Sequence, residues 1–222
     1  MAAKLMQISD VLPQSMQTMK NCSAESKSKI ITPEQFKKKV FEVCPSFEVD
    51  EFIKPIINGI YFYANNEQDP AGLFHPEKGI LLWGPVGTGK STIIKILGEV
   101  LRMKGQGYAT LNCSYLATKF SADGLDALNT STYNETENGS RPHNRAFDEL
   151  GREPIPAKHY GNELNVMQYI LQCRYELRSR VKTHITTNLK PEALEKVYGS
   201  YISDRMNEMF NVVELQGKSR RQ

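Results

Sequence analysis

Apolar residues recur at helical spacing in two stretches near the start of the chain. The stretch "TPEQFKKKVFEV" opens with Thr32, which is a good helix N-cap and is followed by a proline. The later stretch "FEVDEFIKPIINGIYFYANN" places apolar side chains on one side of a predicted helix, with Pro55 either near the helix start or at a kink. These patterns predict an N-terminal helical segment over residues 31–66.

A different pattern begins with the apolar run "ILLW" (80–83), which is typical of a parallel strand buried on both faces. Residues 91–104 then carry apolar side chains at helical spacing, and Gly105 ends the predicted helix. Further strands are predicted at "GYATL", "AFDEL", "THITTN" and "NVVEL", with helices at 163–180, "PEALEKVYG" and "SYISDRMNEMF". Strands that alternate with helices form parallel sheets, so we expect an α/β fold with a parallel five-stranded sheet flanked by helices.

Polar composition marks two segments outside this alternation. Residues 1–30 lack sustained periodicity and are expected to form a mobile polar leader, and residues 121–145 to form a turn-rich surface excursion. Residues 67–222 then make up the α/β domain. No segment has the apolar core of a signal peptide or the length of a membrane span, so we expect a cytoplasmic protein without a membrane partner.

Composition excludes few function classes. The formal net charge of +3 is too small to indicate a nucleic-acid partner by itself. The 4 cysteines lie far apart without a CxxC spacing, which predicts neither a zinc cluster nor a disulfide framework. Candidate chemistry therefore has to come from local motifs.

The strongest motif is "GPVGTGKST" (84–92), which satisfies the G-x-x-x-x-G-K-[ST] pattern between a buried strand and an amphipathic helix. Its glycines allow the loop to curl so that backbone N–H groups point at phosphate oxygens, and the following helix adds its positive N-terminal end. Lys90 is expected to reach the β- and γ-phosphates, and the Ser91 hydroxyl to bind Mg²⁺. The predicted nucleotide contacts are Gly84, Pro85, Val86, Gly87, Thr88, Gly89, Lys90, Ser91 and Thr92.

A magnesium nucleotide also requires an acidic residue at the end of a neighbouring strand. The stretch "AFDEL" offers Asp148 for the metal and Glu149 beside it for activation of the attacking water. Its apolar part, Ala146 and Phe147, is short for a central strand, so an exposed acidic turn is the alternative. We predict that Ser91 and Asp148 hold the metal and that Glu149 is catalytic.

Two polar residues further along each have a functional and a structural interpretation. Asn188 ends the strand "THITTN", where it can hydrogen-bond the γ-phosphate or the attacking water, or cap the next helix. Arg205 can pair with Asp204 or Glu208 on its own helix, or act as an arginine finger towards a neighbour's γ-phosphate. The residues alone leave both choices open.

At this point the chain resembles the DnaC/IstB-like branch of the AAA+ ATPases, which contains replicative helicase loaders and transposition helper ATPases. The resemblance covers about residues 75–220 and rests on the blocks "LLWGPVGTGKST", "FDELG", "MQYILQCRYE", "THITTNLKPEALEKVYG", "SDRM" and "VVELQGKSRR". It implies a P-loop fold of the AAA+ type, with Glu149 as catalytic base, Asn188 as polar sensor and Arg205 acting between subunits. Few residues follow "VVEL", so the helical lid of many AAA+ proteins is not expected.

The resemblance also implies cofactors and partners. ATP and Mg²⁺ are expected at the site, with self-association into a ring or filament and a replicative helicase or transposase as client. Single-stranded DNA is the expected nucleic-acid partner, since such machines hold single strands with basic and stacking side chains. Candidates for those contacts are Lys119, Phe120, Lys218, Arg220 and Arg221.

Other P-loop functions fit the sequence less well. A small-molecule kinase is the alternative from another class, but no Arg-rich lid or acceptor pocket is recognisable, and Glu149 beside Asp148 favours water as acceptor. No N-K-x-D guanine signature or LSGGQ-like signature occurs, which disfavours GTPases and ABC-type transporters. A nucleotide-dependent adaptor that binds DNA or a partner without hydrolysis stays open because of the short strand before Asp148.

Overall fold

Strand β1 (Gly79–Trp83) is buried on both faces, as the run "ILLW" predicted. The structure is a computed structural model that describes residues 30–220. The leader predicted over residues 1–30 therefore lies, except for Ile30, outside the described residues. Because successive strand residues point to opposite faces, Ile80 and Leu82 enter one hydrophobic core and Leu81 enters another.

Five parallel strands form the central sheet, in the order β2-β5-β8-β1-β9. The other four strands are β2 (Ala109–Asn112), β5 (Arg145–Leu150), β8 (Thr183–Thr187) and β9 (Phe210–Glu214). The predicted parallel five-stranded sheet is therefore confirmed. Strand β5 lies inside the sheet between β2 and β8, and its residues Ala146 and Phe147 are fully buried. The alternative of an exposed acidic turn at this position is wrong.

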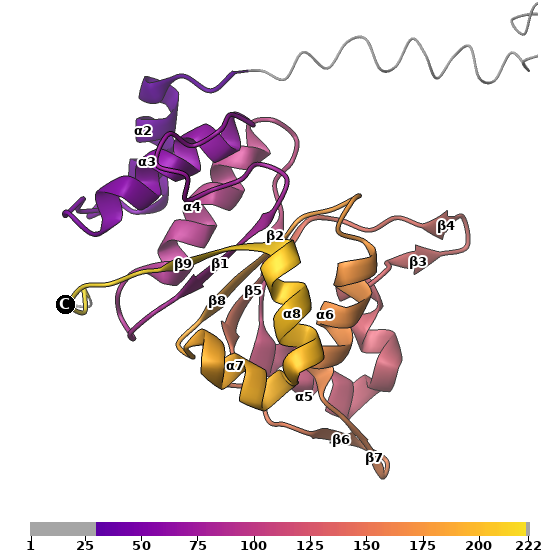
Figure 1. The fold of residues 1–222 in the computed structure, drawn as a ribbon. Coiled ribbons are helices and arrows are strands. Elements are labelled where there is room, and N and C mark those ends of the chain that lie inside the picture. The colour runs from indigo at the N-terminus through magenta and orange to yellow at the C-terminus, as the bar shows by residue number, and fades with distance from the viewer. Residues whose placement is uncertain (1–29, 221–222) are drawn as a thin grey trace, which may run out of the picture. The chain divides into compact units, whose positions relative to one another are not determined.

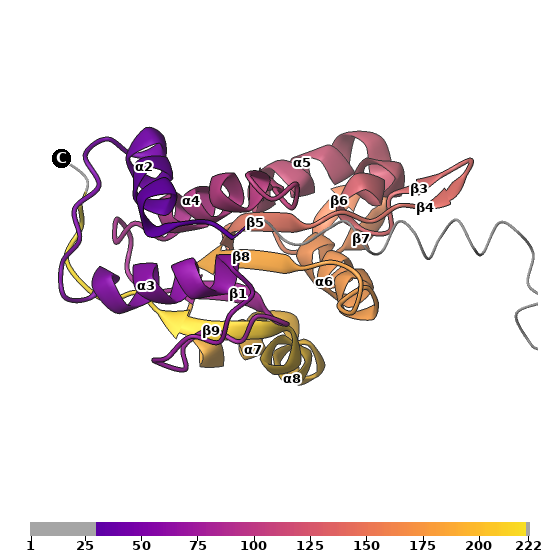
Figure 2. The same cartoon turned by 90° about the horizontal axis from the view of Figure 1, so that it is seen from above.

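Helices cover both faces of the sheet (Figure 1 and Figure 2). One face packs against α2 (Pro33–Val43), α3 (Ile53–Ala64) and α4 (Lys90–Arg102). The other face packs against α5 (Cys113–Asp123), α6 (Val166–Glu176), α7 (Pro191–Tyr198) and α8 (Ser200–Met209). The molecule is thus a three-layer α/β/α structure, the arrangement expected when helices connect parallel strands.

The two N-terminal helices begin where the sequence signals place them. Thr32 caps α2 in a capping box with Gln35, in which each side chain accepts a hydrogen bond from the other residue's backbone N–H. Pro55 is the third residue of α3, so it lies near the helix start and does not kink it. Asp50 precedes α3, and its Oδ1 accepts hydrogen bonds from the N–H groups of Phe52 and Ile53, both at 2.9 Å.

The polar stretch at 121–145 contains a short helix, η2 (Gly124–Ser131), and a small hairpin of β3 (Glu135–Thr136) and β4 (Gly139–Ser140). A second hairpin, β6 (Ala157–His159) with β7 (Asn162–Leu164), was not predicted and shortens the helix expected at 163–180. Asn165 stops that helix from starting earlier, because its side chain accepts a hydrogen bond from the N–H of Gln168 and thereby caps α6.

No helix follows β9 within the described residues, whose last segment is 215–220. Over residues 30–220, each helix is too short or too polar to cross a membrane.

Candidate active site

The carboxyl ends of β1, β5 and β8 meet at one edge of the sheet. The pairing register places Trp83 of β1 and Leu150 of β5 both opposite Thr187 of β8. The segments that follow or end these strands therefore converge: the P-loop after β1, Asp148 and Glu149 near the end of β5, and the residues after β8. Parallel α/β sheets bind ligands at this edge.

A cavity of about 570 Å³ opens at this edge. Most of the P-loop lines it, together with residues of β5 and β8, the connector between α2 and α3, and the chain after β9. The lining residues are Cys44, Ser46, Phe47, Glu48, Ile53, Val86, Gly87, Gly89, Lys90, Ser91, Thr92, Glu149, Thr186, Asn188, Ser219 and Arg220. The cavity has room for a nucleotide, and its lining includes both apolar side chains, such as Phe47, and charged ones, such as Lys90.

The P-loop holds Lys90 in a fixed position. Lys90 is 7% exposed, and its Nζ donates hydrogen bonds to the carbonyl oxygens of Gly84 at 2.8 Å and Pro85 at 2.7 Å. Thr88 lies buried beneath the loop, where its Oγ1 donates to the same Pro85 carbonyl at 3.0 Å. Gly89 starts α4 from a left-handed conformation at φ 99°, which a residue with a side chain adopts only with strain. The ammonium group and the α4 N-terminus provide a strong anion site together.

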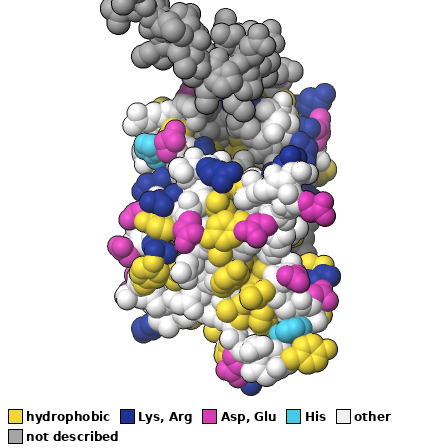
Figure 3. Space-filling model, turned by 90° about the vertical axis from the view of Figure 1, so that its right-hand side faces the viewer, with side chains coloured by type: hydrophobic (Ala, Val, Ile, Leu, Met, Phe, Trp, Pro, Cys, Tyr) yellow, Lys and Arg dark blue, Asp and Glu magenta, His cyan; other side chains and the backbone are white. Residues whose placement is uncertain are grey.

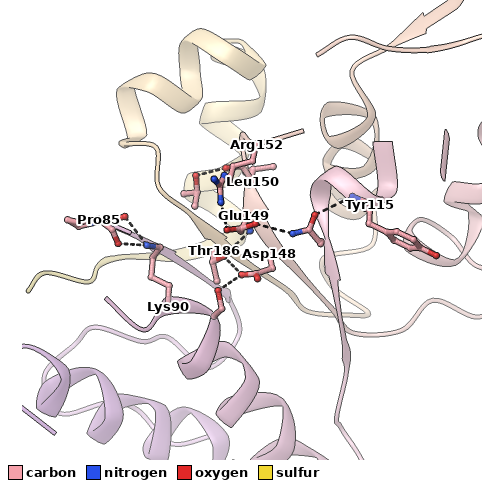
Figure 4. Close-up of polar contacts among 12 residues, drawn as sticks. Pro85, Lys90, Tyr115, Asp148, Glu149, Leu150, Arg152 and Thr186 are labelled. Carbon is pink, nitrogen blue, oxygen red and sulfur yellow. Dashed lines mark hydrogen bonds and ion pairs between the residues drawn. The ribbon is translucent and has the colours of Figure 1, made fainter. Parts of the chain in front are cut away.

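Ser91, Asp148 and Thr186 form a chain of hydrogen bonds across three elements. Asp148 and Thr186 are labelled in Figure 4. Ser91 Oγ donates to Asp148 Oδ1 at 2.7 Å, and Thr186 Oγ1 donates to the same oxygen. Thr186 Oγ1 also accepts the N–H of Glu149 at 3.0 Å. The sequence analysis named Asn188 at the end of "THITTN" and missed Thr186.

Glu149 departs from regular strand geometry, and a register shift in the β5–β8 pairing falls between Phe147 and Leu150. Its φ is 62°, a conformation that costs a residue with a side chain about 1–3 kcal/mol. The carboxylate is held from two sides, by Asn112 Nδ2 at 3.2 Å from Oε2 and by an Arg152 guanidinium nitrogen at 2.6 Å from Oε1. Backbone strain of this kind is typical of functional sites. Neither Asn112 nor Arg152 was recognised from the sequence.

The donor set at Ser91 and Asp148 fits Mg²⁺. Both residues offer hard oxygen atoms: Ser91 Oγ and Asp148 Oδ1 lie 2.7 Å apart, and Ser91 lines the pocket. Among residues 30–220 there is no group of three or more His, Cys, Asp or Glu able to hold a metal ion by themselves. Magnesium sites with one or two protein ligands are usual where substrate phosphates complete the coordination.

A buried thiol lies behind the carboxylates. Cys113 starts α5, is fully buried, and has its pKa raised well above the usual value, first by burial and then by Glu153, Asp148 and Glu149. A protonated, inaccessible thiol is neither a nucleophile nor a metal ligand. Cys113 therefore takes no direct part in the chemistry of the site.

Asn188 lines the cavity directly after β8. The helix α7 begins at Pro191 with Lys190 as its N-cap residue, so the alternative reading of Asn188 as the N-cap of that helix is wrong. Its neighbour Thr187 is fully buried, and its Oγ1 donates to the carbonyl of Leu150 at 2.7 Å. Of these two residues, Asn188 is the one that faces the pocket.

Arg205 lies on α8, outside the lining of this cavity. Its guanidinium group stacks between two aromatic rings, 3.7 Å from the centroid of Tyr201 and 4.2 Å from that of Tyr175. One of its terminal nitrogens is buried without a hydrogen-bond partner in the part of the chain that the structure describes. The structural alternative, a pair with Asp204 or Glu208, does not form there; Glu208 contacts Tyr175 and Arg178 instead.

Among the residues suggested for DNA contacts, Phe120 is wrong. It is 3% exposed and packs in the core beneath α5, so it cannot stack on a base. Lys119 forms an ion pair with Asp123 on the same helix at 3.6 Å, and Lys218 is exposed. Arg220 contacts the P-loop, and Arg221 lies outside the described residues.

Comparison with known proteins identifies the fold. No family model and no curated protein matches the sequence. Among solved structures, a protein described as a primosome component from Streptococcus pyogenes serotype M3 is similar, with 20% identity, a TM-score of 0.58 and coverage of 80% of this chain and 87% of that one. This chain therefore has the same fold as that solved structure.

Two further structures support the same fold. A DnaC helicase loader has 16% identity and a TM-score of 0.57, with 81% of this chain and 99% of that one covered. DnaI has 20% identity and a TM-score of 0.55, with 82% and 93% covered. This chain therefore shares the fold of these solved structures.

Proposed function

We propose that this protein is an AAA+ ATPase that acts in DNA replication or DNA mobility, where it loads or remodels a helicase or transposase on single-stranded DNA. The observation that carries the proposal is the hydrogen bond from Ser91 to Asp148, with Glu149 beside it. It brings the P-loop hydroxyl and the acidic strand end together, as a magnesium nucleotide requires.

The cavity suggests how ATP binds. Its polar end is formed by the P-loop, where Lys90 and the N–H groups at the start of α4 receive the phosphates. Its apolar end is formed by Cys44, Phe47 and Ile53, which offer a surface for the base. The connector between α2 and α3 thereby contributes to nucleotide binding in this proposal.

Hydrolysis follows from the two carboxylates. Ser91 and Asp148 hold Mg²⁺, which when bound offsets the negative charge that develops on the phosphate oxygens. Glu149 orients the attacking water and accepts its proton, and Asn112 and Arg152 keep the carboxylate in place for this step. Asn188 hydrogen-bonds the γ-phosphate or the water from the neighbouring strand.

Arg205 serves a neighbouring subunit in this proposal. It is absent from the lining of its own cavity, and the rings of Tyr201 and Tyr175 orient it at the surface of α8 and α6. An arginine that stacks on aromatic rings keeps its charge and loses little freedom when it binds an anion. The active site is then completed only when copies of the chain assemble into a ring or filament with ATP.

The replication role comes from the similar structures. One is named a helicase loader and another a primosome component, and the AAA+ fold they share with this chain is compatible with the same role here. The face in Figure 3 carries hydrophobic side chains with Lys, Arg, Asp and Glu interspersed on both sides. Such a mixed surface suits a protein partner better than an extended DNA backbone, which calls for a basic track.

Phosphate release in the presence and absence of single-stranded DNA tests this function. We expect magnesium-dependent hydrolysis of ATP that single-stranded DNA increases. Binding of ATP without turnover under either condition would favour the non-hydrolysing adaptor. Transfer of the phosphoryl group to a small molecule in place of water would favour the kinase.

A further inference from the structure

The end of the chain runs beside the P-loop. Strands β1 and β9 pair in parallel, with Trp83 opposite Glu214 as the last pair of the register. Beyond that pair, β1 continues into the P-loop and β9 into residues 215–220, so the two segments leave the sheet side by side. The N–H of Leu215 donates to the carbonyl of Trp83 at 2.7 Å and extends the contact past the strands.

Arg220, which lines the cavity, binds the P-loop through its backbone and its side chain. Its N–H donates to the carbonyl of Gly87 at 2.9 Å, and a guanidinium nitrogen donates to the carbonyl of Thr88 at 2.5 Å. Ser219 lies so close to Gly87 that a Cβ there would be 2.2 Å from the Ser219 hydroxyl oxygen. Gly87 also has a φ of 84°, so both conformation and space require glycine.

The other end of the same guanidinium group reaches the N-terminal helices. It forms an ion pair with Asp50, whose carboxylate also caps α3 through the N–H groups of Phe52 and Ile53. The N–H of Ile53 makes the largest contribution to lowering the pKa of Asp50, and Arg220 adds to it. Arg220 therefore joins the P-loop to the connector that lines the other side of the cavity.

The hydrogen bonds of Arg220 to the carbonyls of Gly87 and Thr88 also determine where the next backbone N–H groups point. The carbonyl of one residue and the N–H of the next belong to one planar trans unit and point in opposite directions. Because Arg220 holds the carbonyls of Gly87 and Thr88, the N–H groups of Thr88 and Gly89 are directed to the side of the loop opposite Arg220. A loop whose N–H groups are fixed in advance binds phosphate without first losing conformational freedom.

We propose that Arg220 is a positioning residue for nucleotide binding, which holds the carbonyls of the P-loop and connects the loop to Asp50; these contacts are called the Arg220 clasp. The inference rests on the proposed binding of ATP in this cavity. Arg220 acts through the loop and the α2–α3 connector, and it does not need to touch the phosphates. The bidentate reach of a guanidinium group is essential, because one side chain must serve a carbonyl and a carboxylate at once.

Equilibrium titration with a fluorescent ATP analogue and Mg²⁺ tests the clasp in the full-length protein. We expect Arg220→Ala to weaken binding about 10-fold, the loss typical of charge-assisted hydrogen bonds. Arg220→Lys should be nearly as weak, since an ammonium group cannot bridge both partners. Asp50→Asn keeps the cap of α3 but removes the ion pair, so it should weaken ATP binding severalfold. The double variant with Asp50→Asn and Arg220→Ala should bind ATP about as weakly as Arg220→Ala alone. Lys218→Ala removes the same charge from the same segment and should bind normally.

Three results would overturn the proposal. Unchanged binding by Arg220→Ala would show that the clasp does not affect the site, and full recovery in Arg220→Lys would show that only charge matters. Tighter binding by Asp50→Asn would show that a released Arg220 contacts the phosphates directly.

If the wild-type protein binds no ATP, the proposed function fails. Amide hydrogen exchange of residues 86–90 in the wild type and Arg220→Ala then still tests whether Arg220 holds the P-loop in place. Faster exchange in the variant supports it, and equal exchange rejects it.

Discussion

The Ser91 hydroxyl donates a hydrogen bond to Asp148 across 57 positions of sequence, at a distance of 2.7 Å. This bond joins the start of α4 to strand β5 and places a hydroxyl and a carboxylate where Mg²⁺ can bind both. Thr186 holds the same carboxylate oxygen from the next strand. The three residues make the metal side of the site a rigid unit, which leads to the first prediction.

Asp148→Asn should remove the magnesium dependence of ATP binding. The amide keeps the size of the side chain but lacks the charge that binds Mg²⁺, so we expect ATP to bind about 10-fold more weakly than to the wild type when Mg²⁺ is present. Binding in the presence of a chelator should be nearly equal for the two proteins. Calorimetric titration with and without Mg²⁺ measures this difference. A variant that still gains affinity from Mg²⁺ would exclude Asp148 as the metal-side acid.

A mixture of two inactive variants should recover activity if Arg205 acts in trans. Arg205→Ala should lower hydrolysis about 100-fold or more while ATP binding is retained, because the arginine lies outside its own cavity. Glu149→Gln keeps Arg205 but lacks the base. In a mixed assembly, an Arg205→Ala subunit with an intact base can receive Arg205 from a Glu149→Gln neighbour, so phosphate release should rise above that of either variant alone.

The control for this experiment is Arg178→Ala. Arg178 also stacks on Tyr175, at 3.9 Å, but the proposal gives it no role in a neighbour's site. It should hydrolyse ATP like the wild type. Loss of ATP binding in Arg205→Ala, or a mixture no more active than its components, would place Arg205 in its own subunit or in the fold.

The stability of the protein should fall in mildly acidic solution because of His184. The ring is fully buried on β8, stacks on Tyr108, and its nitrogens have no hydrogen-bond partner among residues 30–220. Burial, together with the nearby cations Lys182 and Arg174, lowers its pKa to about 3. The unfolded chain takes up a proton near pH 6.5 and the folded chain does not, so stability is full above that pH and decreases below it.

From this shift we expect His184 to reduce the free energy of unfolding by about 2 kcal/mol between pH 8 and pH 5. His184→Phe keeps an aromatic ring beside Tyr108 and should lose this part of the pH dependence. His159→Phe, at a partly exposed position on β6, should keep it. Chemical denaturation at several pH values measures the slopes. Equal slopes for wild type and His184→Phe would show that the buried ring does not control acid stability.

The sequence predicted those parts of the site in which a recognisable motif lies at the end of a predicted parallel strand. The P-loop motif fixed its own conformation through glycines such as Gly89, and the alternation of strands and helices implied that strand ends meet at one edge. Asp148 could be placed there because a parallel strand ends beside it. Glu149 could be placed at the same edge because it is the next residue in the chain. Its strained φ of 62° could not be predicted from the sequence pattern.

Other features depended on contacts that only the folded chain defines. Thr186 and Asn112 reach the carboxylates through strand pairing, and a threonine or asparagine in a strand end carries no sign of its partner. Phe120 was suggested as a stacking residue beside Lys119, but it lies on the face of α5 that packs into the core. The clasp by Arg220 depends on the register between β1 and β9, which no local pattern reveals.

The central claim is that this cavity binds ATP and uses Glu149 to hydrolyse it. The most direct test measures ATP binding and phosphate release side by side for the wild type and Glu149→Gln, with Glu163→Gln, an exposed residue of β7, as a control. The account predicts equal binding by all three proteins and a loss of turnover of about 100-fold or more in Glu149→Gln alone. Wild-type turnover in Glu149→Gln, or no ATP binding by the wild type, would contradict it.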